Sequence, residues 1–169
     1  MMKTARCRSR LLLVCLCLFS ALSACQSASK YPPQWRSEEI DVPSDRLLWE
    51  VTMFALEKER YPTGTDIDPA SLTALSGWRY SLAPFRGQGH RERAEIRFKP
   101  LGPQRYRVEV RVERELNMDP VRPMDISYAE WEPAADNAEA ALILIQRIRS
   151  WIAPQLELRS RSAPRTPGG

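Results

Sequence analysis

Two neighbouring segments alternate between apolar and polar residues, and this alternation constrains the fold more than any other feature of the sequence. Residues 94–98 carry an apolar side chain at every second position, and residues 105–113 do the same from Tyr106 to Val112. A period of two predicts strands with one face on a core and the other in water, which is typical of antiparallel sheets. Residues 100–104 contain two prolines and a glycine, so we expect them to form a hairpin loop between the two strands.

Segments with helical periodicity lie on either side of this hairpin. Residues 44–60 predict a helix with Ser44 as N-cap, and a second helix begins at Asp136 or Asn137 and ends before Pro154. The apolar stripe of the first consists of Leu47, Leu48, Val51, Phe54 and Ala55. The stripe of the second consists of Ala141, Leu144, Ile145, Ile148 and Ile152.

Two weaker strand signals complete the pattern. Residues 72–82 end in an alternation that includes Trp78 and Tyr80, with Gly77 as a possible bulge, and residues 124–131 predict a short strand. The order helix, strands, helix lacks the repeated strand–helix alternation of a parallel sheet. We therefore predict an α+β fold, a two-layer sandwich in which two helices cover one face of an antiparallel sheet of about four strands.

The N-terminal segment has the three parts of a secretory signal. Residues 1–10 are basic, residues 11–22 are apolar, and the small residues Ser23 and Ala24 precede Cys25. The apolar run is shorter than the roughly 20 residues of a membrane-spanning helix. An ordinary secretory signal and an uncleaved anchor are the alternatives to the interpretation that follows.

The sequence Leu22-Ser23-Ala24-Cys25 resembles the lipobox of bacterial lipoproteins. The resemblance implies cleavage between Ala24 and Cys25, a diacylglyceryl group in thioether linkage to the Cys25 sulfur, and commonly a third acyl chain on the new amino group. Two or more acyl chains anchor a protein stably to a bilayer. In enteric-type bacteria an Asp after the cysteine retains the protein in the inner membrane, so Gln26 favours a periplasm-facing position on the outer membrane.

Removal of the signal changes the charge and the cysteine content. The chain carries 25 basic and 21 acidic residues, with four of the basic residues and none of the acids in the signal, so the mature chain is formally neutral. Nucleic acid is not expected as a partner, because its recognition needs a clustered basic face. All four cysteines, Cys7, Cys15, Cys17 and Cys25, lie in the signal or at its end, so the domain has no disulfide.

The roughly 145 residues left after cleavage suffice for one domain. We expect a lipidated cysteine and flexible tether at 25–42, a single α+β domain at 43–158, and a disordered tail at 159–169. The tether is assigned from its polar composition and its Pro-Pro pair, and the tail from its Arg, Ser, Pro and Gly content.

Candidate chemical groups are sparse. His90 is the sole histidine and is expected in an exposed loop. Asp66 and Asp68 resemble the start of a calcium loop, but Ser71 and Gly77 stand where such a loop needs glycine and glutamate. We therefore predict no catalytic residue, no metal site and no bound cofactor.

A cluster of arginines is the remaining candidate. It consists of Arg86, Arg91, Arg93, Arg97, Arg105, Arg107 and Arg111, interleaved with Glu92, Glu95, Glu109 and Glu113. A solvated sheet face of mutual ion pairs is the favoured interpretation, and an anion-binding face is the alternative. Trp78, Tyr80, Trp131 and Trp151 are interpreted as core or rim residues and not as a ligand stack.

These features predict a non-catalytic envelope lipoprotein. Its domain is expected to act as an accessory or scaffold for a membrane or periplasmic protein partner, with the bilayer bound through acylated Cys25. The alternative is a module that binds an anionic envelope component, a lipid headgroup, lipopolysaccharide or peptidoglycan, on the arginine-rich face or in a pocket between helix and sheet.

Overall fold

The computed structural model describes residues 30–64, 66–82 and 88–162, of which residues 66 and 155–162 are described by backbone alone. The signal segment, the lipobox with Cys25, and Arg86 lie outside the described residues. Residues 163–169 of the expected tail lie outside them as well.

The described part of the chain contains two α-helices, one short 3-10 helix and seven strands. The helices are α2 (Asp45–Lys58), the 3-10 helix Ile126–Tyr128 and α3 (Ala138–Ser162). The strands are β1 (Arg36–Asp41), β2 (Asp66–Asp68), β3 (Thr73–Leu75), β4 (Arg79–Ser81), β5 (His90–Gly102), β6 (Arg105–Asn117) and β7 (Trp131–Pro133). The α+β class is as expected, whereas the expectation of about four strands was wrong.

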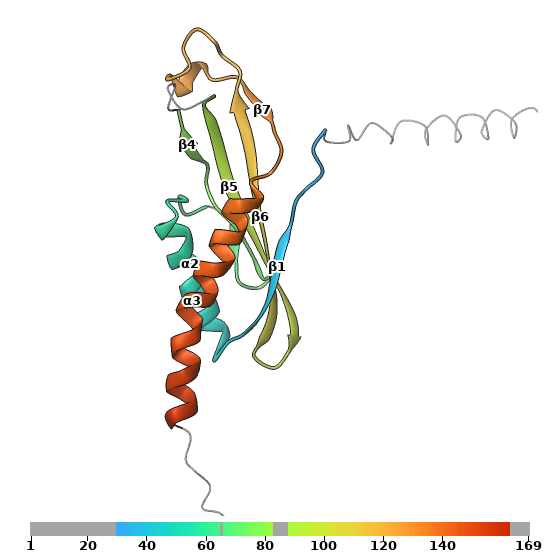
Figure 1. Cartoon of the computed structure of the whole chain (residues 1–169), viewed down its shortest axis with the longest axis vertical. Coiled ribbons are helices and arrows are strands. Elements are labelled where there is room, and N and C mark those ends of the chain that lie inside the picture. The colour runs from blue at the N-terminus through green and yellow to red at the C-terminus, as the bar shows by residue number, and fades with distance from the viewer. Residues whose placement is uncertain (1–29, 65, 83–87, 163–169) are drawn as a thin grey trace, which may run out of the picture.

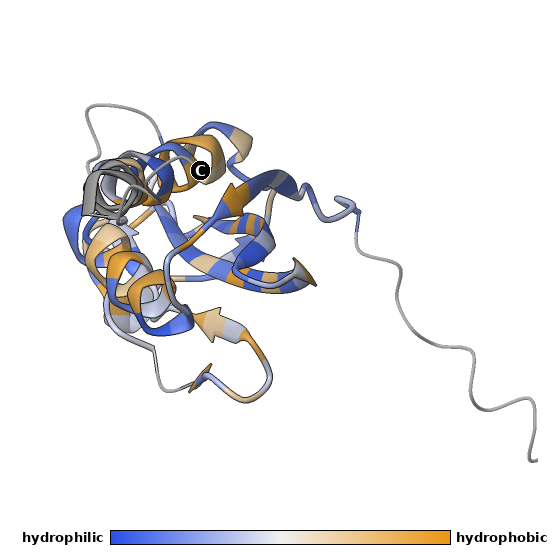
Figure 2. Ribbon diagram, turned by 90° about the horizontal axis from the view of Figure 1, so that it is seen from below, coloured by the Kyte–Doolittle hydropathy of each residue, from blue (hydrophilic) through white to orange (hydrophobic). Residues whose placement is uncertain are grey.

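The long hairpin of β5 and β6 forms the spine of the antiparallel sheet. Each of these strands has 13 residues and is long enough to pair with two short strands in succession. On one side β6 pairs with β1 and, further along, with β7; on the other side β5 pairs with β3 and β4, and β2 extends the sheet from β3. Both helices lie on one side of this sheet (Figures 1 and 2).

Strand β1 occupies residues 36–41, which the sequence assigned to the flexible tether. Its inward face offers a single buried apolar residue, Ile40, so no alternation is visible in the sequence. The strand is held by its pairing with β6, and on the outer side Glu39 accepts hydrogen bonds from Arg105 and Arg107. The tether boundary at residue 42 was therefore wrong.

Other expected boundaries were also wrong, for local reasons. β5 continues through a bulge between Pro100 and Gly102, so residues 103–104 alone connect the hairpin. The expected strand at 72–82 is divided into β3 and β4, which pair with separate parts of β5. Between them the Ser76 hydroxyl accepts a hydrogen bond from the Ala94 N–H at 2.9 Å, replacing a backbone acceptor of the ladder.

The segment 124–131, expected to be a short strand, contains the 3-10 helix and only the first residue of β7. The last helix also continues through Pro154 to Ser162, so its expected end at residue 153 and the expected start of a disordered tail at residue 159 were wrong. A proline inside a helix removes one N–H bond, here to the carbonyl of Ser150. Ser150 is exposed, so water can satisfy that carbonyl.

The helix N-termini follow the sequence signals. Ser44 Oγ accepts a hydrogen bond from the Leu47 N–H at 3.3 Å, and Asn137 Oδ1 accepts one from the Ala140 N–H at 3.1 Å. The C-terminus of α2 is a Schellman motif, since the Tyr61 N–H bonds the Leu56 carbonyl and Arg60 adopts a φ of 60°. Arg60 takes the left-handed position that glycine usually fills.

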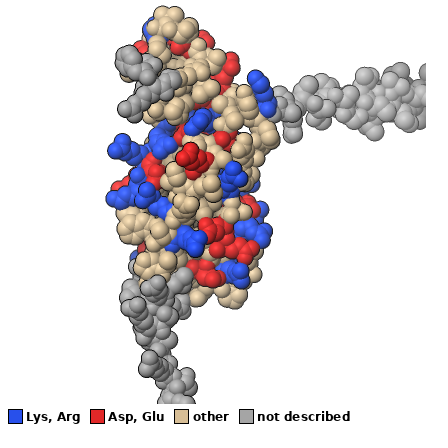
Figure 3. All heavy atoms as spheres, viewed as in Figure 1, with Lys and Arg blue, Asp and Glu red and all other residues tan. Residues whose placement is uncertain are grey.

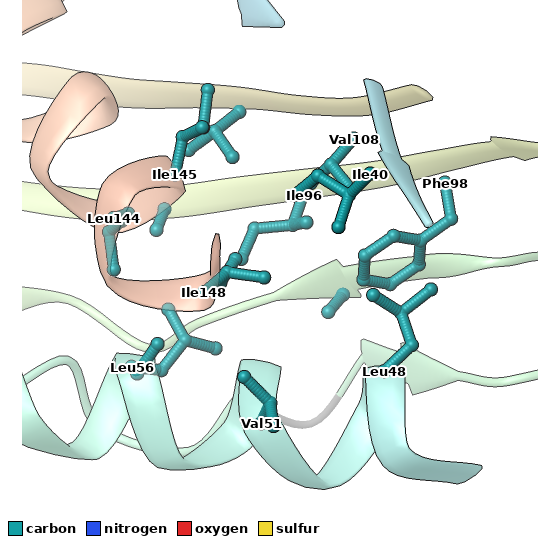
Figure 4. Close-up of a cluster of buried hydrophobic side chains, with 14 of the residues drawn as sticks. Ile40, Leu48, Val51, Leu56, Ile96, Phe98, Val108, Leu144, Ile145 and Ile148 are labelled. Carbon is teal, nitrogen blue, oxygen red and sulfur yellow. The ribbon is translucent and has the colours of Figure 1, made fainter. Parts of the chain in front are cut away.

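One hydrophobic core joins both helices to the inner face of the sheet. Figure 4 shows side chains of α2, α3 and the strands pointing toward one another. The labelled members are Ile40, Leu48, Val51, Leu56, Ile96, Phe98, Val108, Leu144, Ile145 and Ile148, all of them buried. Trp49 of α2 adds an edge-to-face contact with Phe98. The two-layer arrangement with both helices on one face is confirmed.

Candidate functional site

The outer face of the sheet, turned away from the helices, carries the predicted arginine cluster. Each of its described members has a carboxylate within 3.0 Å. The pairs are Arg91–Glu115, Arg93–Glu113, Arg97–Glu95, Arg105–Glu39, Arg107–Glu39 and Arg111–Asp136. The interpretation as a face of mutual ion pairs is confirmed for these six residues, because each arginine is already paired with a protein carboxylate, Glu39 being shared by Arg105 and Arg107.

Aromatic rings at the rim of this face stack against arginine side chains. Trp78 lies under Arg91 and Arg93, with its ring centre 4.3 and 4.6 Å from the guanidinium carbons, and Trp35 lies 4.1 Å from that of Arg97. Trp131 contacts Arg91 in the same way. Because the rings face protein cations, they are not arranged as a stack open to a ligand.

The remaining predicted candidates are dispersed. His90 is the first residue of β5, opposite Ser81 and Leu116, and is half-buried, so its placement in an exposed loop was wrong. Asp68 accepts a hydrogen bond from the Ala70 N–H at 2.9 Å, and this bond stabilises a turn. Within residues 30–64, 66–82 and 88–162 no three His, Cys, Asp or Glu side chains gather closely enough to hold a metal ion.

The inner face contains a polar cluster that the sequence analysis missed. Glu92, assigned to the wet face, has a side chain that is 1% exposed. Its carboxylate accepts hydrogen bonds from Arg79 at 2.5 Å, Arg114 at 2.7 Å and Asn137 at 2.8 Å. A signal was present, because Glu92 lies two residues before Ala94 and shares the phase of the buried side chains.

The donors around Glu92 set its ionisation. Burial alone would raise the pKa of Glu92, but the hydrogen bonds from Asn137, Arg79 and Arg114 outweigh burial and hold the pKa below its ordinary value. The carboxylate is thus charged and fully engaged at neutral pH. It is suited to joining β4, β5, β6 and the start of α3, and not to acting as a general base.

Arg79 extends this cluster to the end of α2. It donates to the Glu59 carbonyl at 2.7 Å and lies over the Tyr61 ring. A hollow of about 200 Å³ lies beside it, lined by Glu59, Tyr61, Arg79, Asn137, Glu139, Ala140 and Ile143. Burial raises the pKa of Tyr61, whose hydroxyl has no hydrogen-bond partner among the described residues. The hollow suits a few water molecules, at about 30 Å³ each.

A wider open groove of about 780 Å³ runs along the exposed side of α2. Its lining is mainly apolar and consists of Trp49, Met53, Phe54, Tyr61 and Pro62 together with Glu50, Glu57, Arg60 and Thr63. The ring of Phe54 is fixed by an edge-to-face contact with Trp151 of α3. An apolar groove with few polar groups fits an apolar side chain or segment better than a charged ligand.

The fold defines an α+β domain of two layers, with an ion-paired outer sheet face and an apolar groove on the helical layer. Comparison with protein-family models and with curated proteins finds no match to this chain. No helix in the described part of the chain is both long and apolar enough to cross a bilayer.

Proposed function

We propose that this protein is a lipid-anchored accessory domain of the bacterial envelope that binds a protein partner and does not catalyse a reaction. The lipobox Leu22-Ser23-Ala24-Cys25 supports the anchor. Gln26 favours the outer membrane, with the domain facing the periplasm.

The observation that carries the partner-binding role is the groove on α2. Trp49, Met53 and Phe54 remain partly exposed although they are large and apolar, and they line one continuous hollow. Exposed apolar surface of this kind marks interaction sites. We propose that the occupant is an apolar segment of an envelope protein.

The alternative, binding of an anionic envelope component on the outer face, has less support. The described arginines of that face are paired, so an anion would have to displace a carboxylate from each arginine that it engages. The hollow on this face is lined by Glu95 and Glu113 as well as by Arg93, Arg97 and Arg111, which gives it both charge signs.

Photocrosslinking in living cells tests the groove. A photoreactive amino acid replaces Met53 in the groove or, as matched control, Leu142, an exposed apolar residue on α3. We expect a discrete adduct from position 53 that is missing from position 142. Equal background labelling at both positions would contradict the proposed groove.

The anchor is tested separately. Cys25→Ala should release the protein from the membrane fraction, and mass spectrometry of the natural product should find a diacylated or triacylated N-terminal cysteine. An intact N-terminus, or membrane attachment of the unlipidated variant, would contradict lipid anchoring.

A further inference from the structure

The loop that connects β6 to β7 exposes an unusual amount of apolar surface. The tip loop, defined as residues 118–130, contains five of the ten large hydrophobic residues that are exposed in the described part of the chain. Val121 is 80% exposed and Met124 is 60% exposed. The other three are Met118, Ile126 and Tyr128.

This exposure belongs to a loop whose backbone is held by side-chain hydrogen bonds. The buried Asn117 side chain donates to the Pro123 carbonyl and accepts from the N–H groups of Asp119 and Glu130. Asp119 accepts from the Val121 N–H at 2.7 Å, and Arg122 lies over the ring of Tyr128. Polar side chains such as Asn117 and Asp119 hold the backbone, while five large apolar side chains remain exposed, which is unusual for a surface loop.

The tip loop lies toward the same end of the molecule as the start of the described chain. Along the long axis in Figure 1, the loop and the first residues before β1 are in the upper half, while the β5–β6 turn and the C-terminal end of α3 are in the lower half. Cys25 and Lys30 are five positions apart in the sequence, which limits their separation to about 18 Å. A bilayer that contains the acyl chains of Cys25 therefore lies near the end of the molecule that carries the tip loop.

The charge of the tip loop indicates what kind of contact it makes. Asp119, Asp125 and Glu130 outnumber Arg122, so the loop has no excess of positive charge for anionic headgroups. In Figure 3 the upper end of the molecule is mainly tan, the colour of uncharged residues. Attraction to a membrane would come from apolar burial, with Tyr128 suited to the interface between headgroups and acyl chains.

We infer that the tip loop inserts Val121, Met124 and their apolar neighbours into the interfacial layer of the bilayer that holds Cys25. This inference rests on the proposed lipid anchor. The domain then has two attachments to the membrane, an acylated cysteine and a shallow apolar wedge. The two together fix its orientation, with the hairpin turn and the α2 groove free for the periplasm.

Depth-dependent fluorescence of the full lipidated chain tests the inference. Val121→Cys or, as control, Leu101→Cys at the opposite end is labelled with an environment-sensitive fluorophore. The only other cysteine of the mature chain, Cys25, has its sulfur occupied by the lipid. In phosphatidylcholine vesicles we expect the probe at position 121 to shift to shorter wavelength and to be quenched by nitroxide-labelled lipid. The probe at position 101 should show neither change.

The outcomes separate the two proposals. Flotation of the protein with the vesicles reports the anchor, and failure to float means that the anchor at Cys25 is wrong. A floating protein whose probes at positions 121 and 101 both report water overturns the tip-loop inference alone and points to a protein as the occupant of the loop. A spectral shift that requires added phosphatidylglycerol overturns it as well, because insertion by apolar burial needs no anionic lipid.

Discussion

Arginine–glutamate pairs occur on both faces of the β5–β6 hairpin, but their surroundings differ. On the outer face Arg93 and Glu113 lie opposite each other, with side chains 33% and 27% exposed. On the inner face Glu92 is 1% exposed and is shared by Arg79 and Arg114. Water screens the first pair and cannot reach the second carboxylate. The same type of ion pair therefore contributes little to stability on the outer face, whereas on the inner face it joins several secondary-structure elements.

The largest expected effect is that of Glu92→Ala. Removal of the buried carboxylate leaves Asn137 and two partly exposed arginines, Arg79 and Arg114, without their shared acceptor. Loss of the hydrogen bonds to this charged group should cost about 3 kcal/mol in total. Urea unfolding at neutral pH should show this loss in the free energy of unfolding. Glu113→Ala is the matched control on the outer face, with an expected loss of at most about 1 kcal/mol. Equal losses would contradict the distinction between the two faces.

The acid dependence of stability should distinguish Glu92→Gln from the wild type. Because the folded pKa of Glu92 is lowered from its ordinary value of 4.5, its ionised form stabilises the fold above that value, and this contribution is lost as the pH falls through the folded pKa. We expect the variant to be less stable by about 2 kcal/mol at neutral pH. The gap should close in acid, measured by urea unfolding across a pH series; a constant gap would mean that Glu92 is not the titrating group.

Asp136→Asn is expected to have an intermediate effect. Its side chain is 3% exposed and makes a two-point contact with Arg111, at 2.7 and 3.2 Å, and it also accepts from the Gln34 N–H. Loss of the charge should cost about 1.5 kcal/mol. Thermal unfolding would measure this, and Arg111→Lys, which keeps the positive charge without the two-point geometry, is the companion variant. No change in either variant would show that outer-face pairs are weak even when one partner is buried.

The smallest expected effect is the coupling between Arg93 and Glu113. A double-mutant cycle with alanine at both positions should give less than about 1 kcal/mol, and the value should decrease as salt is added. A coupling of several kcal/mol, or one insensitive to salt, would mean that Trp78 shields this pair from water as effectively as the core shields Glu92.

Several features could be predicted because their causes are local. Ser44 and Asn137 were identified as candidate helix caps from a few neighbouring residues, and the alternation from Tyr106 to Val112 identified the inner face of β6. β2 and most of β7 were missed because three residues are too few to show a period, and β1 because Ile40 is its only buried apolar residue. The sequence analysis assigned the residues of the tip loop to a loop and a short strand, and it did not identify their apolar side chains as an exposed surface.

The alternation of residues along the chain by itself determined which side of the hairpin meets the helices, since successive side chains of a strand must point to opposite faces. The interleaved Glu and Arg residues favoured ion pairs on the outer face, but two of the carboxylates, Glu39 and Asp136, come from outside the hairpin. The same alternation places Glu92 on the inner face, but only the tertiary structure decided that a charged side chain is satisfied there, because its hydrogen-bond donors come from positions 13, 22 and 45 residues away along the chain. A charged side chain on the inner face is tolerable only when such partners surround it. No local sequence pattern indicates which distant residues will supply those hydrogen bonds.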